Sequence, residues 1–307
     1  MKKIIFITAI VCLLLGMMTG ARAAVGTDRE GTPVALPASI ERIASFGPSN
    51  TEILTALGLA DKLVAVDAYS ANIEGIPADL QLFDMMTPDA EKILQLNPDI
   101  LFVTGMSKAD GDDPYKPIKD AGICVIYIPS SVSIEDITED IRYIASVVGE
   151  NEKGEEIVGQ MEAAVTAVKA VGDTVVEKKS VYFEISAAPY MYSFGSGVFL
   201  NEMIKLVGAT NVLASQNAWI SVTDEAVLAA NPDVILTSVN YIDNPVEEIM
   251  ARSSWDALTA VKNNQVYYID TDASNRPSQN IIKALREIAV AIYPELYQEL
   301  EVQKAGE

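Results

Sequence analysis

The chain has 307 residues, a formal net charge of −21 and no histidine. Without histidine, Ser-His-Asp and Cys-His catalysis are excluded and the usual ligands for zinc are missing. The acidic balance argues against nucleic acid, whose phosphates require a basic surface. These absences argue against capture of a bare transition metal, and we expect no metal site, no cofactor and no nucleic-acid partner. The length allows two modest domains in a monomer.

The first 23 residues predict export. Two lysines precede an apolar run over residues 4–18, and Ala21 and Ala23 are small residues where a signal peptidase reads the chain. Cleavage before Ala24 removes three basic residues and no acidic ones, so the mature charge is −24. An uncleaved membrane anchor is the alternative, but the apolar run is short for a span. We expect an exported protein, periplasmic or extracellular.

Two cysteines are present, and only one belongs to the mature chain. Cys12 lies inside the apolar run without the small preceding residue expected of a lipid-anchored cysteine, so we assign it to the discarded peptide. Cys124 then has no partner for an intramolecular disulfide. It lies in an apolar, strand-like run, where a buried small residue is the simplest explanation.

Short apolar strands alternate with helices in two sets. In the first, strands are expected at 63–66, 100–103 and 124–128, and helices at 51–57 and 90–96. In the second, strands are expected at 181–185, 234–237 and 266–269, and helices at 200–207 and 224–230. This alternation predicts α/β structure with parallel strands.

Residues 133–174 lie between the two sets and carry no strand signal. Ser133 and Asp136 fit a helix start, and Gly149 fits its end. A second helix is expected from 151 to about 169, long enough to bridge two lobes. We divide the chain into a signal peptide (1–23), an N-terminal lobe (24–148), a bridging helix (149–174) and a C-terminal lobe (175–307).

The two halves also share motifs. Glu52 and Gly58 are six residues apart, as are Glu202 and Gly208. Asn-Pro-Asp precedes a strand at 97–99 and again at 231–233, where proline stops a helix and sets the turn into the strand. Acidic residues lie near the start of the preceding helix in each half: Asp89, Glu91, Asp224 and Glu225. Pseudo-symmetric lobes and independent use of a common turn both account for the repetition.

An ordered set of motifs gives the chain a family resemblance from about residue 40 to 297. They are Arg-Ile-Ala-Ser-Phe-Gly-Pro-Ser-Asn-Thr-Glu (42–52), Gly-Leu (58–59), Leu-Val-Ala-Val (63–66), Leu-Asn-Pro-Asp-Ile-Leu (96–101), Asn-Glu (201–202), Gly-Ala (208–209), Arg-Pro (276–277) and Tyr-Pro-Glu (293–295). The chain resembles the cobalamin and ferric-siderophore substrate-binding proteins of ABC importers. The resemblance implies two Rossmann-like α/β lobes joined by a single long helix, with the ligand cleft between the lobes and small closure on binding.

The resemblance also implies docking on the membrane permease through one glutamate of each lobe, which pairs with permease arginines. Glu52 and Glu202 fall on those positions, and an exposed carboxylate suits bidentate recognition by arginine. The alternative for Glu52 is a capping box with Ser49 at a helix start. Glu202 has Phe199 at the corresponding place, so capping explains only one of the two.

The ligand cleft should form from loops that leave the strand ends, as in open α/β sheets generally. Aromatic and methionine side chains give broad contact to a large chelate, and a few polar groups orient it. For each aromatic side chain, packing in the core is an equal alternative, and for Tyr190, beside Ala-Ala-Pro (187–189), it is the stronger one. Trp219 is the strongest ligand candidate. The candidate residues are Tyr69, Met106, Ser107, Tyr190, Trp219, Tyr241 and Arg276.

The resemblance implies a binding protein and not an enzyme, which captures a metal-chelate nutrient, a ferric siderophore before others, for delivery to an ABC permease. Haem is one alternative, since tyrosine can hold haem iron and Tyr69 is a conceivable ligand, and cobalamin is another. The low number of basic residues argues against a triply charged catecholate complex. A rival from another class is an exported enzyme of chelatase-like fold using carboxylates such as Asp67 or Glu184.

Overall fold

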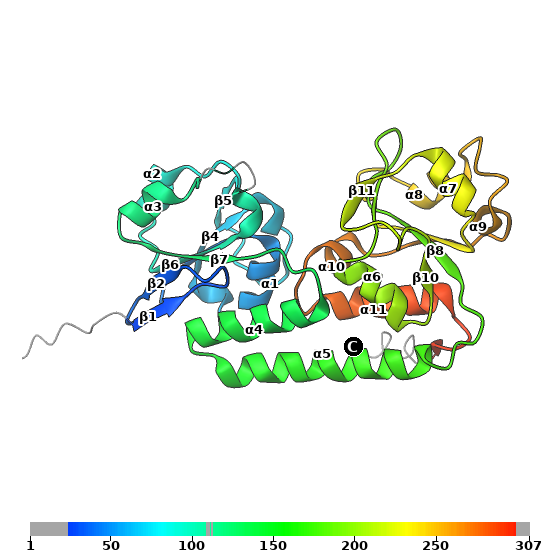
Figure 1. Ribbon diagram of the computed structural model, residues 1–307. Coiled ribbons are helices and arrows are strands. Elements are labelled where there is room, and N and C mark those ends of the chain that lie inside the picture. The colour runs from blue at the N-terminus through cyan, green and yellow to red at the C-terminus, as the bar shows by residue number, and fades with distance from the viewer. Residues whose placement is uncertain (1–23, 109–110, 112, 299–307) are drawn as a thin grey trace, which may run out of the picture.

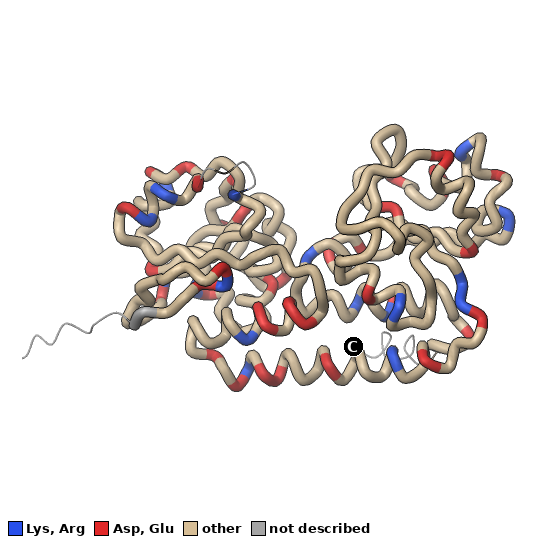
Figure 2. Tube along the Cα trace, viewed as in Figure 1, with Lys and Arg blue, Asp and Glu red and all other residues tan. Residues whose placement is uncertain are grey.

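The computed structural model describes residues 24–108, 111 and 113–298, and the expected signal peptide, with Cys12, lies outside them. Two α/β lobes stand side by side, and the long helix α5 (Asn151–Gly172) runs beneath both (Figure 1). Among the residues described, no helix is both long and apolar enough to cross a membrane. Acidic residues are spread over both lobes and along the lower helices (Figure 2).

The N-terminal lobe is built on a parallel sheet of five strands in the order β5-β4-β3-β6-β7. Its central strands are short apolar runs whose residues are almost all buried, as expected of strands covered on both faces. A small antiparallel hairpin of β1 (Ala24–Thr27) and β2 (Pro33–Leu36) precedes the sheet. The sheet strands are β3 (Ile43–Phe46), β4 (Leu63–Asp67), β5 (Gln81–Phe83), β6 (Ile100–Thr104) and β7 (Cys124–Ile128).

The C-terminal lobe repeats this plan with a parallel sheet of four strands in the order β10-β8-β12-β13. A separate two-stranded antiparallel sheet of β9 (Tyr192–Phe194) and β11 (Trp219–Ser221) stands above it. The sheet strands are β8 (Ser180–Glu184), β10 (Thr210–Asn211), β12 (Val234–Thr237) and β13 (Val266–Tyr268). Both lobes therefore confirm the expected α/β class with parallel sheets.

Helices cover both faces of each sheet. The lower faces carry α1 (Pro48–Ala56) and α4 (Ile134–Val148) in one lobe, and α6 (Phe199–Leu206) and α11 (Ile281–Ile292) in the other. The remaining helices are α2 (Ala90–Gln95), α3 (Lys116–Asp120), α7 (Asp224–Ala230), α8 (Pro245–Met250), α9 (Thr259–Lys262) and α10 (Thr271–Asn275).

The connection between the lobes is helical and packed. Ser133 caps α4 in a capping box with Asp136, and Gly149 ends that helix in the left-handed conformation. One continuous apolar cluster runs from the N-terminal sheet through α4 and α5 to the C-terminal sheet and α11. Because α5 packs against both lobes, it connects them rigidly and is not a flexible linker.

The two Asn-Pro-Asp turns have the same tertiary role. Asn97 and Asn231 both adopt the left-handed conformation, with φ of 45° and 43°. The next aspartate in each turn then accepts hydrogen bonds from backbone N–H groups at the start of its lobe's first sheet strand: Asp99 from Arg42, and Asp233 from Ser180. The repetition thus extends from sequence to structure and supports the pseudo-symmetric interpretation.

Cys124 begins β7 and is half-buried. Burial raises the pKa of its thiol to about 11. Because only the thiolate attacks alkylating agents, we expect native protein at pH 8 to react with iodoacetamide at least about tenfold more slowly than urea-unfolded protein. Mass spectrometry of quenched samples measures both rates, and equal rates would contradict the burial of this thiol.

Candidate functional site

The cleft between the lobes receives loops from the carboxyl ends of both sheets. In each sheet the strand order reverses next to the first strand, between β3 and β6 and between β8 and β12. Open α/β sheets bind ligands at such a switch point, outside the carboxyl ends of the strands. The residues that follow these strands are therefore the primary candidates for ligand contact.

Five expected ligand residues present exposed side chains after these strand ends or in and beside the small sheet of β9 and β11. Tyr69 follows β4, Met106 follows β6, Tyr241 follows β12, and Tyr190 lies between β8 and β9. Trp219 begins β11. Large apolar side chains seldom remain exposed together without a partner, so this group fits a ligand surface better than the core-packing alternative. The exposed residues are Tyr69, Met106, Tyr190, Trp219 and Tyr241.

Two of these side chains are held in place by the C-terminal lobe. The Tyr241 hydroxyl accepts a hydrogen bond from the Ala187 backbone N–H at 2.8 Å and lies 3.1 Å from the Ser186 hydroxyl, so it fixes the loop that carries Tyr190. The Trp219 ring packs edge-on against Phe194, with 5.8 Å between ring centroids. Such anchoring presents apolar area to a ligand at little cost in conformational entropy.

The floor of the cleft contains a cavity of about 490 Å³ between Tyr69 and Arg276. Its lining is rich in side-chain amides, and Arg276 is the only basic residue in it. The described lining residues are Pro48, Ala68, Tyr69, Ala71, Asn72, Asn240, Thr271, Asp272, Asn275 and Arg276. A larger cavity of about 1060 Å³ lies between α5 and α11 and extends to Tyr268 at the end of β13, and none of the expected ligand residues lines it.

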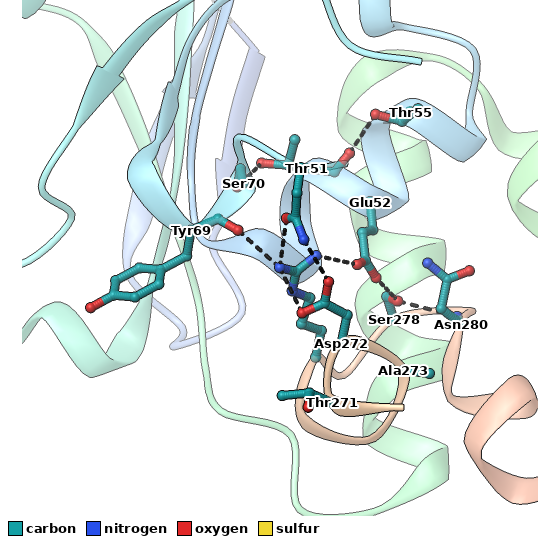
Figure 3. A network of polar contacts seen from close by, with 12 residues as sticks. Thr51, Glu52, Thr55, Tyr69, Ser70, Thr271, Asp272, Ala273, Ser278 and Asn280 are labelled. Carbon is teal, nitrogen blue, oxygen red and sulfur yellow. Dashed lines mark hydrogen bonds and ion pairs between the residues drawn. The ribbon is translucent and has the colours of Figure 1, made fainter. Parts of the chain in front are cut away.

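Glu52 lies beneath this floor and is only 5% exposed. Its Oε1 accepts a hydrogen bond from Arg276 Nη1 at 3.0 Å, and its Oε2 accepts one from the Ser278 hydroxyl. Burial raises the pKa of Glu52, while the hydrogen bonds from Ser278 and Arg276 oppose that rise. Figure 3 shows the carboxylate enclosed by the segment before α11.

The expectation that Glu52 offers an exposed docking carboxylate is therefore wrong. The capping-box alternative is also wrong, because Gly47 is the N-cap of α1 and the helix has no side-chain cap. Glu202 on α6 is half-buried, and its Oε2 accepts a hydrogen bond from the Ile134 backbone N–H at the start of α4 (2.9 Å). Both carboxylates bind other parts of the chain.

Two other expected ligand residues, Arg276 and Ser107, are largely buried. The guanidinium of Arg276 is engaged by Glu52 and Asp272, with N–O distances of 3.0 and 2.9 Å, and its side chain is 13% exposed. It has no unpaired charge to offer a ligand in this conformation. Ser107 is only 6% exposed and presents almost no surface to the cleft.

The carboxylates considered for an enzyme have structural partners. Asp67 is fully buried and accepts hydrogen bonds from the Gly47 backbone N–H and the Ser70 hydroxyl. Glu184 is 1% exposed and forms a bidentate ion pair with Arg252. Within the described residues, no group of three or more acidic or cysteine side chains could hold a metal ion.

Sequence reasoning missed the polar residues of the cavity floor. Asn72 donates to Asp272 at 2.8 Å and accepts from Arg276 at 3.0 Å, which brings together residues about 200 positions apart. Asn72 and Asp272 lie outside the family motifs, whereas Arg276 belongs to the Arg-Pro motif. The only sequence signal for Asn72 is its place in the loop that follows β4, three residues after Tyr69.

These features define a two-lobed α/β binding protein with an aromatic cleft. A model of the family described as "Periplasmic binding protein" matches residues 43–273, and the chain belongs to this family, whose members include substrate-binding proteins of ABC transporters. An uncharacterized ABC transporter substrate-binding lipoprotein of Bacillus subtilis is 32% identical over 89% of this chain and 86% of its own length.

Two further proteins share the fold. A vitamin B12-binding protein of Vibrio parahaemolyticus is 27% identical over 81% of this chain and 88% of its own length. The crystal structure of a possible iron-binding periplasmic solute-binding protein of Staphylococcus epidermidis is 26% identical and has a TM-score of 0.73, covering 83% of this chain and 99% of that one.

Proposed function

We propose that this protein captures a large metal chelate outside the cytoplasm, without chemical change, and delivers it to an ABC permease. The group of exposed side chains on the facing strand ends of the two lobes carries this proposal. Tyr69 and Met106 come from one lobe, and Trp219 and Tyr241 from the other, so a broad ligand would be held from both sides. The relatives named for vitamin B12 and iron support the same chelate class.

The charge of the cleft favours a chelate of low net charge. Arg276 is the only basic residue of the described floor cavity, and Glu52 and Asp272 already neutralise it. A triply anionic catecholate complex would lose its hydration there without gaining a cation. A corrinoid or a hydroxamate-type ferric siderophore avoids this cost, and amides such as Asn72 and Asn240 suit their polar edges.

Tryptophan fluorescence provides the test. Residues 24–307 would be titrated with cyanocobalamin, a ferric hydroxamate, a ferric tricatecholate and haemin. Trp255 is fully buried, so a ligand in the cleft should quench mainly the partly exposed Trp219. We expect saturable quenching with a Kd of about 1 μM or tighter for one of the first two, a binding free energy near −8 kcal/mol.

Trp219→Phe is the control and should remove most of the quenching while inner-filter effects persist. Haemin binding through Tyr69 would instead produce a visible absorbance band that Tyr69→Phe abolishes. Mass spectrometry of the released ligand should show it intact, because a binding protein performs no turnover. A tricatecholate that binds tightest would contradict the low-charge proposal, and failure of all four ligands would contradict the chelate class.

A further inference from the structure

The polar network below the cleft joins elements of opposite lobes. Glu52 belongs to α1 of the N-terminal lobe, whereas Arg276 and Ser278 lie between α10 and α11 of the C-terminal lobe (Figure 3). Ser278 is completely buried, and Gln279 donates to the Glu52 backbone carbonyl at 3.3 Å. The contact is therefore a built interior feature and not a surface ion pair that water screens.

Arg276 extends this contact to the ligand-facing loop. Its Nη2 donates to the backbone carbonyl of Tyr69 at 2.9 Å and to Asn72 Oδ1 at 3.0 Å. Figure 3 shows the Tyr69 carbonyl directed at the network while the aromatic ring points away from it. The other side of this loop is fixed within its own lobe, because the Tyr69 backbone N–H donates to Asp67.

Glu202 makes the corresponding contact from the other lobe. It lies on α6, as Glu52 lies on α1, and each helix ends at a glycine in the left-handed conformation (Gly58 and Gly208). Its carboxylate accepts from the Ile134 backbone N–H, at the start of α4. Each of the two equivalent helices thus directs one carboxylate into the other half of the molecule.

We infer that Glu52 and Arg276 form an interlobe clamp that sets the angle between the lobes and positions Tyr69, so that Arg276 acts on ligand affinity through the clamp and not by ligand contact. The planar guanidinium suits this task, since its five donors can hold Glu52, the Tyr69 carbonyl and Asn72 together. Loss of Arg276 leaves Glu52 buried without an opposite charge, and loss of the Glu52 charge leaves Arg276 paired only with Asp272 of its own lobe. Either change weakens the link between the lobes.

Interlobe distances in ligand-free protein test the clamp independently of the proposed function. Spin labels would be placed on Lys116→Cys (α3) and Lys262→Cys (α9), both exposed, in a Cys124→Ala background. Double electron–electron resonance spectroscopy then measures the distribution of distances between the two labels in the parent, Glu52→Gln, Arg276→Met and the double variant. Lys283→Met, which breaks the ion pair with Asp270 inside one lobe, is the matched control.

We expect both single variants to broaden the distance distribution, the double variant to broaden it no further, and Lys283→Met to leave it unchanged. Non-additivity is the signature of residues that act as one unit. Circular dichroism confirms that each variant is folded. An unchanged distribution in Glu52→Gln would overturn the clamp, whatever the ligand is.

Ligand affinity separates positioning of Tyr69 by Arg276 from direct contact of Arg276 with the ligand. This measurement uses the chelate that binds best and does rest on the proposed function. If the clamp holds the binding-competent arrangement, Glu52→Gln and Arg276→Met should both weaken binding by about three- to tenfold, as the competent fraction falls. Arg276→Lys should restore part of the affinity in an otherwise unchanged chain. A loss confined to Arg276→Met, with Glu52→Gln unaffected, would mean direct ligand contact and would overturn the inference.

Discussion

Replacing Arg252 with methionine should lower the free energy of unfolding by about 3–5 kcal/mol, the usual cost of removing one partner from a buried ion pair. The Arg252 side chain is 8% exposed, and its two terminal nitrogens lie 2.7 and 2.8 Å from the carboxylate oxygens of Glu184. Its guanidinium also lies 4.3 Å from the centroid of the Trp255 ring. Methionine fills similar space but leaves Glu184 ionised or forces it to take a proton.

Urea unfolding followed by circular dichroism measures this cost. Arg142→Met is the matched control, because Arg142 pairs with Glu155 and Glu162 on the surface, and its loss should cost no more than about 1 kcal/mol. Adding Glu184→Gln to Arg252→Met should recover part of the stability, since the uncompensated charge is then gone. Equal effects of Arg252→Met and Arg142→Met would contradict a structural role for the buried pair.

Replacing Glu91 and Glu225 together by alanine should abolish transport and leave ligand affinity within about twofold. With Glu52 and Glu202 engaged inside the molecule, we propose these two as the carboxylates that meet the permease. Each is the exposed second residue of its helix, α2 or α7, and each precedes its Asn-Pro-Asp turn by six residues. The two helices lie on the upper parts of the two lobes, on either side of the cleft (Figure 1).

The expected size of the loss in transport follows from the energetics of charge pairs in interfaces. Truncating one partner of a hydrogen-bonded charge pair in an interface costs about 2–5 kcal/mol, so two such losses reduce permease affinity by at least about a thousandfold. Uptake of labelled ligand by cells that carry the permease measures transport, and fluorescence titration measures ligand binding. Glu152→Ala with Glu156→Ala on α5 is the control with the same change in charge. Normal uptake by the Glu91 and Glu225 variant would remove the docking role.

Secondary structure was largely predictable because it depends on local patterns. The expected strands at 100–103 and 124–128 agree with β6 and β7 to within one residue, and the helix at 224–230 is α7 itself. The capping box at Ser133 and the end at Gly149 are confirmed. Strand β3 was missed because a serine interrupts its apolar run, Ile-Ala-Ser-Phe, and because it lies inside the motif that was read for its family resemblance.

The polar part of the site could not be predicted in the same way. The partner of Glu52 is 224 residues away, whereas Ser49 is three residues away, so a reading from sequence sees the local capping box and not the distant arginine. The exposed aromatic residues were predictable, since strand ends locate them without any knowledge of partners. The exposure of a charged residue depends on the packing of the whole molecule. The neighbouring residues in the sequence therefore do not reveal whether its side chain is buried.

Helix α5 fixes the distance between its attachment points on the two lobes. Its last residue, Gly172, packs so closely on the C-terminal lobe that a β-carbon there would lie 2.0 Å from the Leu206 carbonyl oxygen, and Lys153 near its start lies beside Gly58 of the other lobe. The 19 residues between these two contacts span about 28 Å at 1.5 Å per residue. A helix neither stretches nor shortens appreciably, so the lobes can tilt but cannot change their spacing. Closure on a ligand must therefore come from tilting of the lobes about this helix, and not from a change in the distance between their attachment points.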